Sequence, residues 1–287
     1  MALYFASDFH LGAPNYEDSK AREQSLVRWL EYISKDATEI YLLGDVFDFW
    51  FEYKRVIPKG FSRLFGKLAE LSDKGIKLHF FLGNHDMWVK SYFHEEFNME
   101  THTDPLTKIF FGQRYYLGHG DGLGPGDKGY KFIKRILRSP LCQWAFARLH
   151  PNFGIRIAQY FSNKSRKGSV KDKRYNGKDK EWLYLYVKEM QAVNPHDFYV
   201  FGHRHLPLNL EADGARYFNL GEWLSHQTFL RVDEGEIQFL RWNGEHSQAI
   251  TSPHDSNVYW HWTRANGRGY SSDSTAPKSS HFYVFSC

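Results

Sequence analysis

The chain of 287 residues is 42% hydrophobic, 18% aromatic and 24% charged, with a formal net charge of +4. This composition excludes a wholly disordered chain, and the length is enough for one large domain or two smaller ones. No run approaches the roughly 18 consecutive apolar residues that predict a membrane-spanning helix. The two cysteines, Cys142 and Cys287, are too few for a disulfide framework, which favours a reducing cytoplasm.

The first part of the chain alternates between strand and helix patterns. Strands are predicted at Leu3–Ala6, Ile40–Leu43 and Ile76–Leu82. Between them, apolar residues recur at helical spacing, first at Leu26, Trp29, Leu30 and Ile33, then at Phe61, Leu64, Phe65, Leu68 and Leu71. This order predicts βαβ units and an α/β fold.

Two more strands, Arg114–Leu117 and Phe198–Phe201, flank a long region of helical pattern. Three later strands are predicted at Arg216–Leu220, Thr228–Val232 and Glu236–Trp242. The intervening Asp233-Glu234-Gly235 joins the last two as a hairpin. After Thr251 no period is discernible, so residues 252–287 are predicted to be a disordered tail.

The insertion at about 128–194 has an unusual charge. It carries 16 basic and 4 acidic residues, whereas the rest of the chain carries 21 and 29. A solvated lysine-rich face would explain the charge, but interleaved aromatic residues favour contact with phosphates, nucleic acid or anionic lipid. The insertion lies between the predicted strands Arg114–Leu117 and Phe198–Phe201. We therefore expect it to cover the carboxyl ends of the strands.

Each of five predicted strands ends in a polar cluster, and in open α/β sheets ligands bind at that edge. The clusters are Asp8-Phe9-His10, Gly44-Asp45, Gly83-Asn84-His85-Asp86, Gly118-His119 and Gly202-His203-Arg204-His205. Each alone also occurs as a turn or a cap. Together they supply seven carboxylate, amide and imidazole ligands, a mixture that suits Mn, Fe or Zn. Two ions that share a carboxylate would use all seven, as in phosphate ester hydrolysis.

These five motifs, in this order, resemble those of the calcineurin-like metallophosphoesterases. The resemblance implies a four-layer αββα sandwich of two mixed sheets, covering residues 1–251, with a helical lid insertion at about 128–194. It implies that Asp8, His10 and His205 hold one ion and that Asn84, His119 and His203 hold the other. Asp45 would bridge the two ions.

The same resemblance implies catalytic roles beside the ions. Metal binding would bring the pKa of a bound water toward about 7, so that a nucleophile exists at neutral pH. His85 would stabilise the transition state or protonate the leaving oxygen. Asp86 would either orient His85 or serve as a turn residue.

Within this family the chain resembles the UDP-2,3-diacylglucosamine diphosphatases of lipid A biosynthesis. The features that show this resemblance are the segments Ser7–Gly12 and Leu43–Trp50, the turn His119-Gly120-Asp121-Gly122 and the length of the insertion. This implies hydrolysis of the pyrophosphate bond to UMP and 2,3-diacylglucosamine 1-phosphate, with Mn²⁺ as the metal. It also implies a cytoplasmic enzyme at the inner membrane surface, with no stable nucleic-acid partner. The implied substrate-binding residues are Asn84, His85, Asp127, Ser165, Ser169, Lys171 and His203.

Two other classes of function remain open on sequence. The same dimetal chemistry would serve a different phosphodiesterase, a phosphatase or a nuclease, since the basic insertion could follow a nucleic acid backbone. The chain could also be a non-catalytic binding scaffold stabilised by metal.

Overall fold

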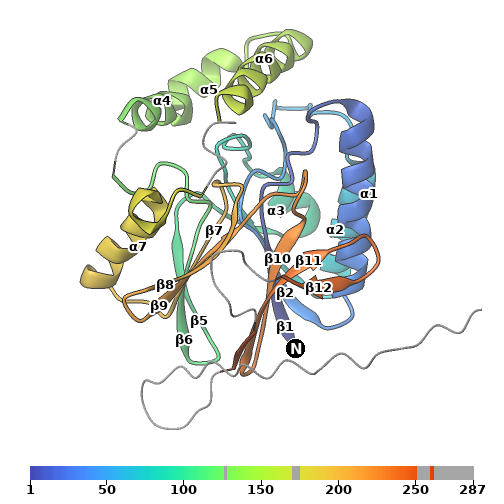
Figure 1. The fold of residues 1–287 in the computed structure, drawn as a ribbon. Helices are drawn as coiled ribbons and strands as arrows, with labels where there is room; N and C mark the ends of the chain where they lie inside the picture. The colour runs from blue at the N-terminus through green and yellow to red at the C-terminus, as the bar shows by residue number, and fades with distance from the viewer. Residues whose placement is uncertain (126–127, 170–174, 251–258, 262–287) are drawn as a thin grey trace, which may run out of the picture.

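The computed structural model describes residues 1–125, 128–169, 175–250 and 259–261. These residues form two β-sheets packed face to face, with helices on both outer faces (Figure 1). The fold is therefore the four-layer α/β sandwich that the sequence predicts.

The first sheet is mixed and runs in the order β12-β11-β10-β1-β2-β3-β4, with β13 paired to β11. β1, β2, β3 and β4 are parallel to one another, whereas β10 is antiparallel to β1. Its strands are β1 (Ala2–Ala6), β2 (Ala37–Leu42), β3 (Lys77–Phe81), β4 (Glu100–His102), β10 (Thr228–Asp233), β11 (Glu236–Trp242), β12 (Ser247–Ala249) and β13 (Tyr259–His261). The predicted hairpin is confirmed, because Asp233 pairs with Glu236 across a two-residue turn.

The second sheet is also mixed, in the order β5-β6-β7-β9-β8. β6, β7 and β9 are parallel, and the edge strands β5 and β8 are antiparallel to their neighbours. Its strands are β5 (Leu106–Phe110), β6 (Gln113–Leu117), β7 (Phe198–Phe201), β8 (Pro207–Ala212) and β9 (Ala215–Leu220).

Alternate residues of the strands build separate cores, because successive side chains point to opposite faces of a sheet. Leu3 and Phe5 of β1 pack between the two sheets, whereas Tyr4 belongs to the core beneath the first helices. Those helices are α1 (Tyr16–Ile33), α2 (Ser62–Asp73) and α3 (Tyr92–Phe97), on the outer face of the first sheet (Figure 1). A third core joins α7 (Trp182–Val193) to the outer face of the second sheet.

The structure divides the insertion predicted at 128–194. Helices α4 (Lys128–Arg138), α5 (Pro140–Phe146) and α6 (Pro151–Ser169) lie together above the carboxyl ends of the strands (Figure 1). The short helix η2 (Lys178–Lys180) and α7 follow, and α7 is a structural layer because Leu183 and Val187 are fully buried against the second sheet. Of the predicted tail at 252–287, only β13 lies among the described residues. No helix in the described ranges is long and apolar enough to cross a membrane.

Candidate active site

Both sheets bring their polar clusters to one edge of the sandwich. The clusters after β1, β2 and β3 come from the first sheet, and those after β6 and β7 come from the second. Backbone hydrogen bonds join these loops, with Asp8 N donating to Gly44 O and Gly202 N donating to His119 O, at 3.0 and 2.9 Å. The site therefore lies where the two sheets meet, and neither sheet could form it alone.

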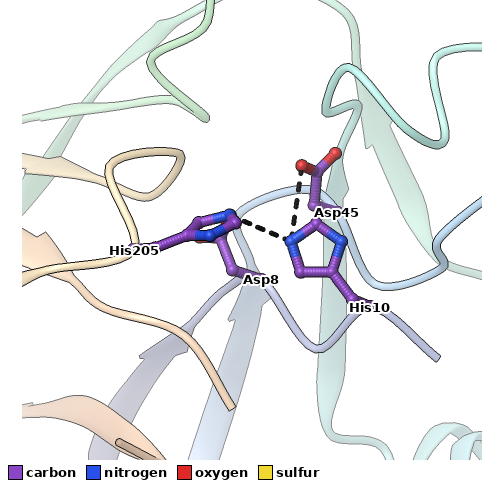
Figure 2. Close-up of side chains that lie close together, drawn as sticks. All are labelled: Asp8, His10, Asp45 and His205. Carbon is purple, nitrogen blue, oxygen red and sulfur yellow. Dashed lines mark hydrogen bonds and ion pairs between the residues drawn. The ribbon is translucent and has the colours of Figure 1, made fainter. Parts of the chain in front are cut away.

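One group consists of Asp8, His10, Asp45 and His205, whose ligand atoms lie within 4.8 Å of one another (Figure 2). His205 Nε2 is 3.0 Å from His10 Nε2 and 3.2 Å from Asp8 Oδ1. His10 Nε2 is 3.8 Å from both Asp8 Oδ1 and Asp45 Oδ2. Such a set of two carboxylates and two imidazoles could hold one divalent ion.

A second group, Asp45, His119 and His203, meets the same distance limit. His119 Nε2 is 3.4 Å from Asp45 Oδ2 and 3.2 Å from the side-chain oxygen of Asn84. The other nitrogen of His119, Nδ1, is 2.8 Å from the carbonyl oxygen of Leu43, which fixes the ring orientation. Asp45 thus lies in both groups, where a bridging ligand would have to be.

The buried polar atoms of the site fit bound cations. Asp45 is 1% exposed, and its Oδ2 atom has no hydrogen-bond partner. A buried carboxylate oxygen without a partner is costly unless a cation neutralises it. The same atom is the one nearest to His10 and His119. The site therefore binds divalent metal ions, and Asp45 Oδ2 is placed to contact them.

The pKa values show the same preference for positive charge. Burial raises the pKa of Asp45, but the imidazoles of His119 and His85 outweigh it and hold this pKa well below its usual range. Burial lowers the pKa of His119, but the negative charge of Asp45 beside it raises this pKa to about 10. Carboxylates that draw a proton onto a buried imidazole would equally stabilise a metal ion in its place.

Backbone conformation sets the site apart from the rest of the fold. Ten non-glycine residues in the described chain have positive φ, and half of them are in the two groups: Asp8, His10, Asp45, His203 and His205. This conformation costs about 1–3 kcal/mol per residue and persists only when the surroundings enforce it. Arg22, which is buried, provides part of that enforcement by donating to the carbonyl oxygens of Phe9 and His10, at 2.6 and 2.9 Å.

Three of the motif glycines are required by close packing around the same carboxylates. A Cβ atom at Gly83 would collide with Asp45, and one at Gly202 would collide with Asp8 and Ser7. At Gly44 it would collide with the ring of His119 and with the backbone of Gly83. The glycine before each ligand therefore lets neighbouring loops approach within contact distance.

His85 lies at the rim of the first group, with its ring centroid 4.9 Å from that of His10. Its Nδ1 atom is 2.9 Å from the carbonyl oxygen of Asp48 and 3.2 Å from the hydroxyl of Ser162 on α6. That hydroxyl also donates to the Asp48 carboxylate at 2.8 Å. Asp48 and Ser162 therefore orient the imidazole and leave Nε2 available to a reacting group.

Asp86 is predicted either to orient His85 or to serve as a turn residue, and its carboxylate accepts hydrogen bonds from backbone N–H groups. Asp86 is fully buried. Burial and the charge of Asp45 raise its pKa to about 7. Its carboxylate accepts from the backbone N–H groups of Gly83, Asp45, Val46 and Phe47. Asp86 thus holds the loops after β2 and β3 together.

Four predicted substrate-binding residues cannot be placed. Asp127 and Lys171 lie outside the described residues, and the side chains of Ser165 and Ser169 on α6 are outside the described part as well. The remaining three, Asn84, His85 and His203, lie at the strand ends, with His203 packed beside His119 at a centroid distance of 5.1 Å.

The sequence analysis predicts no individual role in the site for Asp48, Ser162 or Asp121. Asp48 stands in the run after β2 and Ser162 in a helix 114 positions later, with no motif to connect them. Asp121 accepts from Tyr130 at 2.7 Å and pairs with Lys134 at 2.6 Å, which fastens α4 to the turn after β6. Only the docking of α4 and α6 over the strand ends brings these residues to the site.

The fold and the double ligand cluster define a dimetal phosphoesterase. A family model described as "Calcineurin-like phosphoesterase" matches residues 1–207, and the chain belongs to that family.

Three relatives of this chain share the name UDP-2,3-diacylglucosamine hydrolase. The chain is 39% identical over 241 residues to the UDP-2,3-diacylglucosamine hydrolase of Porphyromonas gingivalis (strain ATCC BAA-308 / W83), covering 79% of this chain and 92% of that protein. It is 28% identical over 246 residues to the hydrolase of the same name from Edwardsiella ictaluri (strain 93-146), covering 84% and 92%. A third such hydrolase, from Aeromonas hydrophila, is 29% identical over 245 residues.

Proposed function

We propose that this chain hydrolyses the pyrophosphate bond of UDP-2,3-diacylglucosamine, releasing UMP and 2,3-diacylglucosamine 1-phosphate in lipid A biosynthesis. The observation that carries the proposal is the 39% identity to a UDP-2,3-diacylglucosamine hydrolase over 92% of that protein, together with a ligand cluster suited to phosphoester chemistry. The enzyme is a hydrolase. Its proposed substrate is UDP-2,3-diacylglucosamine.

In this proposal Asp8, His10 and His205 hold one ion, and Asn84, His119 and His203 hold the other. Asp45 belongs to both, as its position in the two groups supports. The bound ions, proposed to be Mn²⁺, would supply a deprotonated water and neutralise charge on the phosphoryl oxygens. A mixed set of nitrogen and oxygen ligands can hold Mn²⁺, and the choice of this metal rests on the resemblance to the enzyme group named above.

The chain's own residues position the substrate and move the proton. Asn84, His85 and His203 lie at the strand ends, where they would contact the phosphoryl oxygens. His85, oriented through Nδ1 by Asp48 and Ser162, would use Nε2 to stabilise charge or deliver a proton to the leaving oxygen. The lid residues Asp127, Ser165, Ser169 and Lys171 remain proposed contacts for the rest of the substrate.

A cleft of about 820 Å³ lies next to the site, between the loop after β1, the N-terminal part of α1 and helix α6. It is bounded by Leu11 and Asp48 on the side of the site, by the loop Val56–Phe61, and by Ile155 and Arg156 of α6. The cleft is large enough for part of an acylated sugar, and its wall combines apolar side chains with basic and acidic ones. It supports a substrate that carries both acyl chains and a diphosphate.

The direct test uses the purified chain with Mn²⁺ and UDP-2,3-diacylglucosamine, with UMP measured by chromatography. We expect metal-dependent release of UMP and no release after chelation. The matched substrate control is UDP-glucosamine without acyl chains, which should turn over more slowly because it cannot fill the cleft. No UMP, together with rapid cleavage of a nucleic acid or a phosphoprotein, would favour the other phosphoesterase functions. No turnover of any phosphoester would favour the binding scaffold.

A cytoplasmic location and peripheral attachment to the inner membrane also belong to this proposal. Helices α4–α6 expose large apolar side chains next to basic ones, including Phe132, Leu141 and Trp144, which are 63%, 74% and 57% exposed. Arg148 lies over the Trp144 ring at 5.1 Å. An exposed basic and aromatic surface beside the substrate cleft suits an anionic membrane surface.

We expect the double substitution Arg135→Gln/Arg148→Gln to weaken binding to vesicles containing anionic lipid. Each basic residue at such a surface contributes about 1 kcal/mol, so loss of two corresponds to about 30-fold weaker binding. Vesicle co-sedimentation at low and high salt measures this effect. The control Arg241→Gln removes one exposed charge from β11, far along the chain from the lid, and should bind unchanged. Equal binding by all three proteins would contradict the attachment surface.

A further inference from the structure

A second cluster of histidine and glutamate side chains lies within the first sheet, separate from the strand ends. His79 is in the middle of β3, and Glu100 and His102 are on the neighbouring edge strand β4. Asn84 follows His79 by five residues, which is about 16 Å of extended chain. The cluster therefore cannot share ions with the candidate active site.

The three donor atoms form a compact triangle. His79 Nδ1 is 3.2 Å from His102 Nε2 and 3.4 Å from Glu100 Oε2. His102 Nε2 is 3.9 Å from the same glutamate oxygen. Zinc bonds to nitrogen and oxygen are about 2.0–2.2 Å long, so neighbouring donors of a tetrahedral site lie roughly 3.3–3.6 Å apart. The observed triangle is close to that size without any movement of the backbone.

The environment of His79 holds its ring in place. His79 is 1% exposed, and its ring stacks on Tyr41 at a centroid distance of 4.2 Å and an angle of 3°. Its other nitrogen, Nε2, is 3.2 Å from Glu39 Oε2, and Tyr41 donates to the same oxygen at 2.5 Å. A carboxylate behind a histidine that ligates through its other nitrogen is the usual support of a zinc ligand.

Charge and access also fit a divalent ion. Glu39 and Glu100 carry two negative charges, which match a divalent cation beside two neutral imidazoles. Glu100 is 59% exposed, so the cluster opens to solvent and water could supply a fourth ligand. Two imidazole nitrogens and one carboxylate favour zinc over Mg²⁺ or Ca²⁺, which prefer oxygen ligands.

We propose that His79, His102 and Glu100 form a zinc site that fastens β4 to β3. β4 is an edge strand of only three residues, and the chain continues from it to β5 of the second sheet. An ion bound across β3 and β4 would hold this short strand at the point where the chain changes sheets. This site is independent of the hydrolysis proposed above.

The test measures zinc bound per chain in the full-length protein carrying Asp45→Asn, which disables the catalytic ligand cluster. After dialysis against zinc, Glu100→Gln and His102→Gln in this background should each bind one zinc fewer than the background protein. Glu39→Gln should retain the site with 10–100-fold weaker affinity, because it supports a ligand without contacting the ion. The control His94→Gln changes an exposed histidine on α3 outside the cluster and should bind as much zinc as the background protein.

Thermal unfolding distinguishes a lost site from a damaged fold. Without zinc, Glu100→Gln should unfold at the same temperature as the background protein, because Glu100 is largely exposed. Zinc should raise the unfolding temperature of the background protein and of His94→Gln, but not that of Glu100→Gln, and Mg²⁺ should have no such effect. Equal zinc content in all variants, or an equal thermal response, would show that His79 and His102 are only a hydrogen-bonded pair and would overturn the proposal.

Discussion

Asp45→Asn is expected to reduce kcat about 10³–10⁴-fold and to lower the metal content of the protein. Asp45 is the one carboxylate that lies in both ligand groups, and its Oδ2 atom is buried without a hydrogen-bond partner. Paired ions contribute several kcal/mol of charge stabilisation in the transition state, and about 4–6 kcal/mol corresponds to this loss of rate. An amide at this position keeps the shape of the side chain but removes the charge that holds the ions.

The measurement pairs kcat for UMP release with metal per chain from elemental analysis. Asp73→Asn makes the same substitution at an exposed aspartate at the end of α2 and should alter neither quantity. Because Asp45 Oδ1 also accepts from His85 N at 2.8 Å, circular dichroism and thermal unfolding should be recorded to show that the variant is folded. A folded Asp45→Asn enzyme with normal turnover and two ions per chain would refute the bridging role.

His85→Ala is expected to reduce kcat about 10²–10⁴-fold while leaving the metal content unchanged. The imidazole is held through Nδ1 by Asp48 and Ser162. It lies beside His10 but belongs to neither of the two ligand groups that share Asp45. A positioned general acid or charge-stabilising group contributes a factor of this size. Retained metal would separate this effect from that of Asp45→Asn.

The leaving group distinguishes the two roles of His85. With p-nitrophenyl esters the leaving oxygen needs little protonation, so loss of a general acid should matter much less than for UDP-2,3-diacylglucosamine. An equal loss on both substrates would indicate charge stabilisation alone. His94→Ala removes an exposed imidazole on α3 and is the matched control. Unchanged kcat on both substrates would remove His85 from the catalytic machinery.

The docking of the lid helices α4–α6 explains how Asp48 and Ser162 come to orient His85. Trp88 Nε1 donates to the Leu137 carbonyl at 2.8 Å, and the Phe146 ring packs on Phe51 and Trp88, each at a centroid distance of 4.7 Å. These contacts anchor α4 and α5 on the loops after β2 and β3. The neighbouring α6 can then place Ser162 between Asp48 and His85. The orientation of His85 therefore depends on the position of the lid.

The order of strands and the identity of the ligand residues could be read directly from the chain. Apolar runs such as Ile40–Leu43 need only local spacing to be recognised, and the polar cluster follows each run at once. Since parallel strands end at a common edge, the convergence of Asp8, Asp45 and Asn84 could be predicted without coordinates. The glycines before the ligands were visible too, although the contacts that require them were not.

The short strands gave no such local signal. β4 has three residues, and β5 alternates half-buried with exposed positions at the sheet edge, so neither shows a run of apolar residues. The assignment of α7 to an outer layer also depended on packing, because its apolar pattern resembles that of the lid helices before it. Only its burial against β7 and β9 distinguishes α7 from the lid helices.

Residues brought together by long-range packing were decided by the tertiary structure alone. Asp86 stands next to His85 in the chain, yet its side chain turns inward to accept four backbone N–H groups, while the distant Ser162 reaches the imidazole. The pairing of His79 with His102 likewise depends on strand register, which sequence spacing does not encode. Local pattern determines which side chains each strand end carries, but the direction of a side chain depends on burial and hydrogen bonding that exist only in the assembled fold.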